Sequence, residues 1–207
     1  MSKLITRLTN YLGYYLLPSL ILLRGKIRRR GDELLLKCGG RQLRFKYINW
    51  APFPLNEVFV KEVYKKLDVK GKVVVDVGAS IGDTATYFSV RGARHIYGFE
   101  VDAGRWKISK ENLKRNGIKN ATLYLSGYKP SLVGQKATVL KVDCEGCEYS
   151  LFKNLGQSLK KFDQIIIEYH HGSSVLEKQL TSLGFKIEFL TPQNGELGVL
   201  YAKKMGK

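Results

Sequence analysis

The chain has 207 residues, of which 44% are hydrophobic and 26% are charged. This composition excludes general disorder and gives room for one folded domain with a short extension. Lysine and arginine number 35 against 18 acidic residues, a formal net charge of +17. Such a charge attracts nucleic acid, anionic lipid or an acidic substrate without choosing among them, and solvated lysine-rich faces are the alternative explanation.

The N-terminal segment combines an apolar run with a basic one. Residues 11–23 carry no charge, and Arg24, Lys26 and residues 28–30 follow directly. A membrane-spanning helix needs about 20 apolar residues, so this run is too short to span a bilayer. It predicts either a helix packed on the domain, which we favour, or an interfacial anchor with its arginines on anionic head groups.

A β-hairpin and a helix are predicted next. Glu33–Lys37 and Gln42–Lys46 flank a Gly-Gly pair, which is typical of a hairpin turn. Asn56–Leu67 has apolar residues at helical spacing, with Asn56 as the expected N-cap. Pro52 and Pro54 indicate a linker between them. We therefore expect an N-terminal extension at 1–54 and a main domain at 55–207.

The main domain shows strands alternating with helices and ends in a hairpin. Short apolar runs such as Val73–Val75 are typical of strands buried on both faces of a parallel sheet. This order predicts an α/β fold, a Rossmann-like doubly wound sheet with an antiparallel last strand. The strands are expected at 72–77, 95–100, 121–125, 137–142, 164–168, 185–190 and 197–202, and the helices at 83–91, 103–116, 148–159 and 174–183.

A glycine-rich turn follows the first strand of this sheet. Gly78 and Gly82 lack the spacing of the dinucleotide fingerprint, and Asp76 places a carboxylate at the strand tip. Glu100, at the end of the next strand, suits the two hydroxyls of a ribose. A carboxylate at the tip suits a cationic ligand, so the pattern predicts S-adenosyl-L-methionine (SAM). The alternative is that Asp76 caps the next helix and Glu100 is merely solvated.

Further acidic residues follow the fourth and fifth strands. Asp143 and Glu145 come directly after the fourth, and Glu168 and His170 end the fifth. Neighbouring parallel strands end at one edge, so we expect these four groups to converge there. Glu148 is expected in the following helix. Acids at a helix start are also common for electrostatic reasons alone, which is the simpler explanation.

These motifs, taken in order, resemble the FkbM family of methyltransferases. The matching segments are D-V-G-A-x-x-G-D from Asp76, F-E ending at Glu100, K-V-D-C-E-G-C-E from Lys141 and I-E-Y-H ending at His170. The resemblance implies SAM-dependent O-methylation of a hydroxyl on a glycan, lipid-linked or small-molecule acceptor. It also implies cofactor contacts from Asp76, Gly78, Ala79, Gly82, Asp83, Glu100, Asp143 and, where the family usually has Asn-Ala, Ser126.

Methyl transfer needs an aligned acceptor oxygen and a group that takes its proton. We expect His170 to be the base, with Asp143, Glu145 and Glu168 orienting it or the acceptor. No metal is expected, although a divalent ion held by these same four residues is the less favoured alternative.

Two other functions remain open. The basic charge favours an RNA methyltransferase, although no separate RNA-binding module is visible. A non-catalytic Rossmann-like binding module is the second alternative. The three cysteines form no disulfide framework and favour a reducing, cytoplasmic setting, with peripheral membrane contact through residues 11–30 as an option. Cys144 and Cys147 form a C-x-x-C pair, for which a redox role is the less favoured interpretation.

Overall fold

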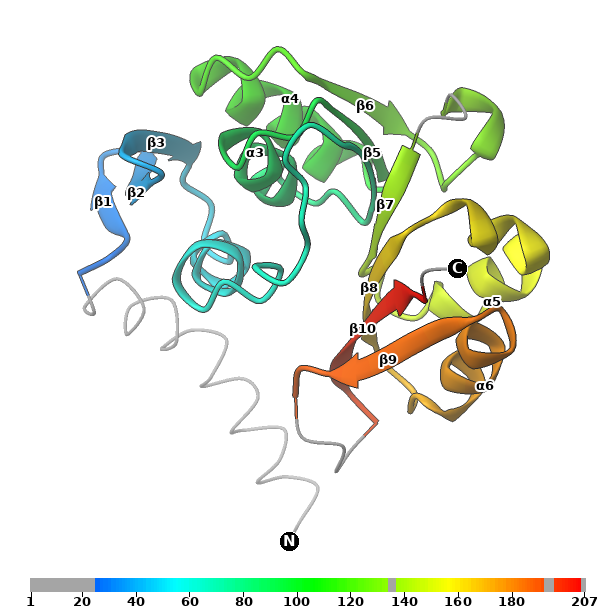
Figure 1. Cartoon of the computed structure of the whole chain (residues 1–207). Helices are drawn as coiled ribbons and strands as arrows, with labels where there is room; N and C mark the ends of the chain where they lie inside the picture. The colour runs from blue at the N-terminus through cyan, green and yellow to red at the C-terminus, as the bar shows by residue number, and fades with distance from the viewer. Residues whose placement is uncertain (1–24, 134–136, 192–195, 206–207) are drawn as a thin grey trace, which may run out of the picture.

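The main sheet of the protein has seven strands, and the computed structural model describes residues 25–133, 137–191 and 196–205 (Figure 1). The strands are β4 (Val73–Val77), β5 (His95–Glu100), β6 (Ala121–Leu125), β7 (Ala137–Val142), β8 (Gln164–Tyr169), β9 (Phe185–Phe189) and β10 (Gly198–Lys204). Their order is β6-β5-β4-β7-β8-β10-β9. Strand β10 runs antiparallel to both of its neighbours, whereas β4 to β8 pair in parallel. The predicted doubly wound sheet with an antiparallel last strand is confirmed.

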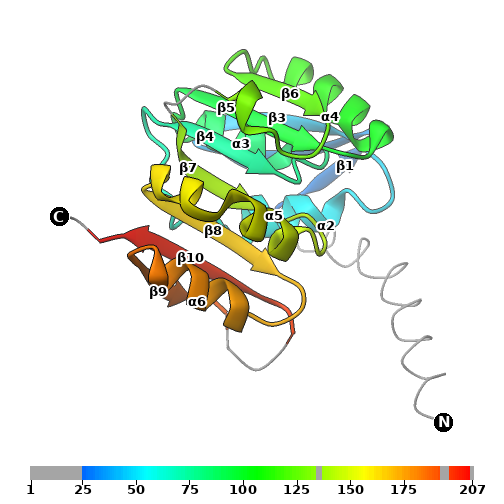
Figure 2. The ribbon, with the colours of Figure 1, turned by 90° about the vertical axis from the view of Figure 1, so that its right-hand side faces the viewer.

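Helices cover the two faces of this sheet (Figures 1 and 2). They are α3 (Asp83–Val90), α4 (Ala103–Arg115), α5 (Glu148–Leu155) and α6 (Ser174–Ser182). Alternate residues of β4 point to opposite faces, because side chains alternate along a strand. Val75 packs in the cluster that α5 and α6 cover, and Val74 packs in the one that α3 and α4 cover. Burial on both faces explains the continuous apolar run of β4.

A second, three-stranded sheet precedes the main one. It consists of β1 (Arg28–Arg30), β2 (Glu33–Cys38) and β3 (Arg41–Lys46), all antiparallel. The predicted hairpin is therefore confirmed, with the basic run as an added edge strand. Its last strand lies on α4, where Oδ1 of Asn112 accepts from the Lys46 amide at 2.8 Å. The extension is thus joined to α4 and its C-cap by specific hydrogen bonds.

The expected helix at 56–67 is largely wrong. A short helix, α2, begins at Pro52, and a π-helical turn spans Asn56–Val60. Proline suits the first helical turn, where its missing N–H costs no hydrogen bond. The helix ends because Glu62 adopts a left-handed backbone with φ 53°. Tyr64 is buried although no helix carries it, Asn56 is no N-cap, and the expected linker is the start of a helix.

Helix α5 is also shorter than expected. It ends at Leu155, and a 3-10 helix continues over Gly156–Lys161.

In the described residues, no helix combines the length and the apolar character that crossing a membrane requires. The predictions for residues 11–23 fall outside the described residues and stay predictions.

Candidate functional site

The glycine loop after β4 touches the chain that leaves β7. Gly78 has a φ of +80°, and a Cβ built on it would lie 1.7 Å from the carbonyl oxygen of Asp143. The Asp143 amide also donates to the carbonyl of Val77 at 3.1 Å. Only glycine permits so close an approach of two backbones. The loop and the end of β7 therefore form one surface at the carboxyl edge of the sheet.

Asp76 lies below this surface and has an internal partner. The register of β4 and β7 places Asp76 opposite Lys141, and both side chains are buried. The Lys141 Nζ lies 3.0 Å from Asp76 Oδ1 and donates to the Gly78 carbonyl at 2.7 Å. Burial raises the pKa of Asp76, and Lys141 opposes this rise. The carboxylate expected to face a cationic ligand is thus already paired with a lysine.

Other predicted cofactor residues surround the loop. Glu100 accepts from the amides of Ser80 and Asp102, each at 2.9 Å. Oδ1 of Asp83 and Oγ of Ser126 are buried, and neither has a hydrogen-bond partner among the described residues. Buried polar atoms without partners are rare in native proteins and indicate a missing ligand or water. These residues therefore fit a polar ligand, whereas Asp76 and the fully buried Ala79 act from beneath.

Burial of Asp83 has an electrostatic consequence. The pKa of its carboxyl rises to about 7, chiefly because of burial, with Lys141 opposing the rise and Asp76 adding to it. A nearby cation would offset this cost. The side chain is thus suited to a ligand that carries positive charge.

The polar groups at the carboxyl ends of β7 and β8 converge as predicted. Asp143, Glu168 and His170 each offer one oxygen or nitrogen, and these three atoms lie within 4.8 Å of one another. The Tyr64 hydroxyl donates to Asp143 Oδ2 at 3.0 Å. The pKa of Glu168 rises to about 8 because of burial and then the charges of Asp143 and Glu57. Parallel neighbouring strands bring these groups to one edge, whereas Tyr64 and Glu57 come from the segment before the sheet.

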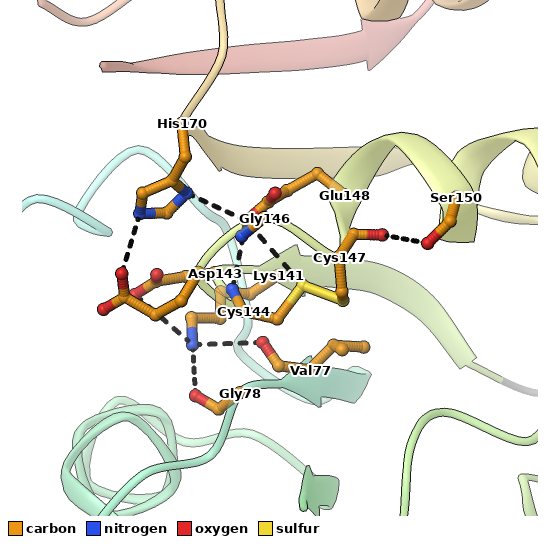
Figure 3. Close-up of a disulfide and its surroundings, with 11 residues drawn as sticks. Val77, Gly78, Lys141, Asp143, Cys144, Gly146, Cys147, Glu148, Ser150 and His170 are labelled. Atoms are coloured by element: carbon orange, nitrogen blue, oxygen red, sulfur yellow. Dashed lines mark hydrogen bonds and ion pairs between the residues drawn. A yellow bond between two sulfur atoms is a disulfide. The ribbon is translucent and has the colours of Figure 1, made fainter. Parts of the chain in front are cut away.

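Glu148 is the residue that organises the next loop (Figure 3). Its Oε1 accepts from the amides of Cys144 and Gly146, each at 3.2 Å. The same oxygen lies 3.0 Å from Nδ1 of His170. Glu148 begins α5, as predicted, but its buried side chain turns back into the site. The sequence could have identified Glu148 as a site residue, because it is the last acid of the K-x-D-x-E-G-x-E segment. No comparable motif pointed to Tyr64.

The remaining predicted residue, Glu145, is the outer member of this cluster. Its Oε2 lies 3.4 Å from Nε2 of His170, and its side chain is 75% exposed. The backbone of Glu145 is left-handed, with φ 57°. His171, by contrast, is exposed, and its amide donates to the Tyr149 hydroxyl at 2.8 Å. The two adjacent histidines therefore have different surroundings.

Cys144 and Cys147 are joined by a disulfide within this loop (Figure 3). The pair is therefore oxidised in the structure, which the cysteine count alone did not predict. The covalent ring encloses Glu145 and Gly146, both of which have positive φ. The third cysteine, Cys38, is free.

Comparison with known proteins gives relatives and a fold. No family model matches the chain. Uncharacterized protein 158B of Sulfolobus islandicus rod-shaped virus 1 is 34% identical over 135 residues, which cover 64% of this chain and 83% of the viral protein. Ribosomal protein L11 methyltransferase of Caldanaerobacter subterraneus is 34% identical over 82 residues, 40% of this chain but only 25% of that protein.

Solved structures agree with the topology described above. TYW2 of M. jannaschii, crystallised with AdoMet, superposes with a TM-score of 0.58 at 16% identity, covering 86% of this chain and 89% of that one. The fold is that of the class I methyltransferases. The chain belongs to the same protein family as uncharacterized protein 158B of Sulfolobus islandicus rod-shaped virus 1.

Proposed function

We propose that this protein is a SAM-dependent methyltransferase. The observation that carries the proposal is the meeting of two groups at one edge of the sheet. The glycine loop with Glu100 and Asp83 forms one group, and the cluster of Asp143, Glu168 and His170 forms the other. Ligands of doubly wound sheets bind at this edge. The fold shared with TYW2, whose structure contains AdoMet, supports the same cofactor.

The cofactor would lie across the glycine loop. Gly78 lets this loop lie against the end of β7, and each oxygen of Glu100 has a second lone pair for a ribose hydroxyl. The unpartnered Asp83 Oδ1 and Ser126 Oγ provide further polar contacts. When bound, SAM supplies an electrophilic methyl group. The buried Asp76–Lys141 pair fixes the loop from below.

The proposed reaction is O-methylation of a hydroxyl on a glycan, lipid-linked or small-molecule acceptor, which follows the resemblance to the FkbM family. Glu148 is acidic and faces Nδ1 of His170, so Nδ1 carries a proton and Nε2 keeps its lone pair. A neutral imidazole of this kind can accept the acceptor's proton. Asp143, Glu145 and Glu168 would orient the imidazole or the hydroxyl.

RNA is the second candidate acceptor. The net charge of +17 favours a polyanion, and the basic strand β1 is exposed along its length. Phosphate contacts dominate nucleic-acid affinity and do not depend on a dedicated module. Methylation of RNA would use the same cofactor edge.

Calorimetry with S-adenosylhomocysteine tests the cofactor. We expect binding by the native chain and about tenfold weaker binding by Glu100→Gln, because one ribose acceptor is lost. Glu188→Gln, which changes an exposed acid of β9, should bind normally. Tight NAD binding without any response to S-adenosylhomocysteine would overturn the assignment. Transfer of labelled methyl groups to glycan, lipid and RNA fractions then identifies the acceptor.

A further inference from the structure

Two carboxylates and an imidazole at the carboxyl edge have the spacing of a metal site. Asp143, Glu168 and His170 each offer one ligand atom, and all three atoms lie within 4.8 Å of one another. Metal–ligand bonds of about 2.0–2.6 Å let one ion contact three atoms at this spacing. The ligands come from the ends of two paired strands, β7 and β8. The rigid sheet therefore fixes their separation.

The charges around these ligands are unbalanced. Glu57 and Glu145 add negative charge to that of Asp143 and Glu168. Lys61 lies 3.7 Å from Glu57, and the buried cation beside the ligands is Lys141, whose Nζ lies 3.9 Å from Asp143 but only 3.0 Å from Asp76. In the part of the chain that the structure describes, Glu168 has no ion-pair partner. Partly buried carboxylates in such excess call for a further cation.

His170 is held in the orientation that a metal ligand needs. Metal-binding histidines usually donate their other ring N–H to a carboxylate, which fixes the tautomer. Glu148 accepts from Nδ1 here, and its side chain is fully buried. The lone pair of Nε2 therefore faces away from Glu148. Glu145, 3.4 Å from Nε2, is exposed and free to turn outwards.

We propose that Asp143, Glu168 and His170 bind a divalent cation, of which Mn²⁺ is the appropriate probe. Carboxylates suit Mn²⁺ and imidazole suits later transition metals, so a mixed set favours a first-row ion. The inference rests on the proposed function in one respect: if the protein is a methyltransferase, the coordination positions of the ion that no residue fills would face the methyl acceptor. An ion on Nε2 would make His170 a ligand in place of the base proposed above, and it would lower the pKa of a bound hydroxyl so that its proton passes to solvent.

Binding of Mn²⁺ alone tests the site. The full chain is stripped with EDTA, desalted and titrated with Mn²⁺, and free ion is counted by electron paramagnetic resonance. We expect one site per chain, about tenfold or more weaker in Glu168→Gln and in His170→Ala, and unchanged in Glu188→Gln. Circular dichroism confirms that each variant is folded. Absent Mn²⁺ binding, or equal binding by the folded site variants, would overturn the proposal.

The same samples separate this proposal from the proposed function. S-adenosylhomocysteine is titrated without metal or acceptor. If it binds while Mn²⁺ does not, the metal site is rejected and the methyltransferase assignment stands. If Mn²⁺ binds at the three residues while S-adenosylhomocysteine does not, the metal site is supported and the cofactor assignment is rejected.

Discussion

Oε1 of Glu148 lies 3.0 Å from Nδ1 of His170, and the two residues stand at the start of α5 and just beyond β8. Two amides of the loop between β7 and α5 donate to the same oxygen. One buried carboxylate thus fixes both the loop that carries Glu145 and the tautomer of the imidazole. Glu148 is a positioning residue, because it acts on the site through His170.

Replacing Glu148 by Gln should lower turnover by about tenfold, because the imidazole loses the charge that fixes it. The ¹⁵N shifts of the ring report which nitrogen carries the proton, and the chain has only three histidines to assign. We expect Nδ1–H in the native protein and a mixture of tautomers in the variant. Glu188→Gln is the matched control. An unchanged tautomer together with unchanged turnover would contradict the assigned role.

His170→Ala should reduce turnover by about a hundredfold or more while leaving S-adenosylhomocysteine affinity nearly intact. His171→Ala should have little effect, because His171 is exposed and contacts Tyr149 instead of Glu148. Both variants are assayed on the acceptor found by the methyl-transfer screen. Equal losses would show that the two side chains do not have the separate roles that their surroundings indicate.

The sheet could be predicted because burial on both faces leaves a readable pattern. Val73–Val75 is a purely apolar run for that reason. Glycines that follow the ends of the helices marked where those helices stop. The helix predicted at 56–67 was wrong because apolar residues at helical spacing can be buried without forming a helix. Its backbone turns at Glu62, and Tyr64 still reaches the core.

Only those site residues could be predicted whose position follows from the order of the strands along the chain. Strand ends gave Asp143, Glu168 and His170, which do converge. The Asp76–Lys141 pair depends on the register of two strands far apart in the sequence, which no local pattern contains. Glu148 was missed because helical position alone does not say where a long side chain turns.

Lys141→Met should destabilise the protein by about 3–5 kcal/mol, because it leaves the buried charge of Asp76 without its cationic partner. Urea unfolding measures the loss. Adding Asp76→Asn to this variant should recover part of it, since the buried charge is then removed. Lys72→Met breaks an exposed pair with Asp68 and should cost below about 1 kcal/mol. Similar costs for the two lysines would contradict the assigned burial of charge.

Asp83 predicts a specific dependence of stability on pH. Its pKa rises from 3.8 to about 7 on folding, because burial outweighs the opposing charge of Lys141. An acid with a raised folded pKa binds its proton more tightly in the native state. Its contribution to stability is therefore complete below pH 3.8, falls as the pH rises towards 7 and is constant above that value.

Asp83→Asn removes this titration, so its stability relative to the native protein should increase by about 2–3 kcal/mol between pH 5 and pH 8. Urea unfolding at pH 5 and at pH 8 measures the stability of the variant and of the native protein. Subtracting one from the other cancels the contributions of other acids such as Glu168. Asp163→Asn, which changes an exposed acid just before β8, is the control. A cationic ligand should reduce the cost of ionised Asp83, so saturating SAM should narrow the pH-dependent gap. A gap that SAM leaves unchanged would place the cofactor's charge away from Asp83.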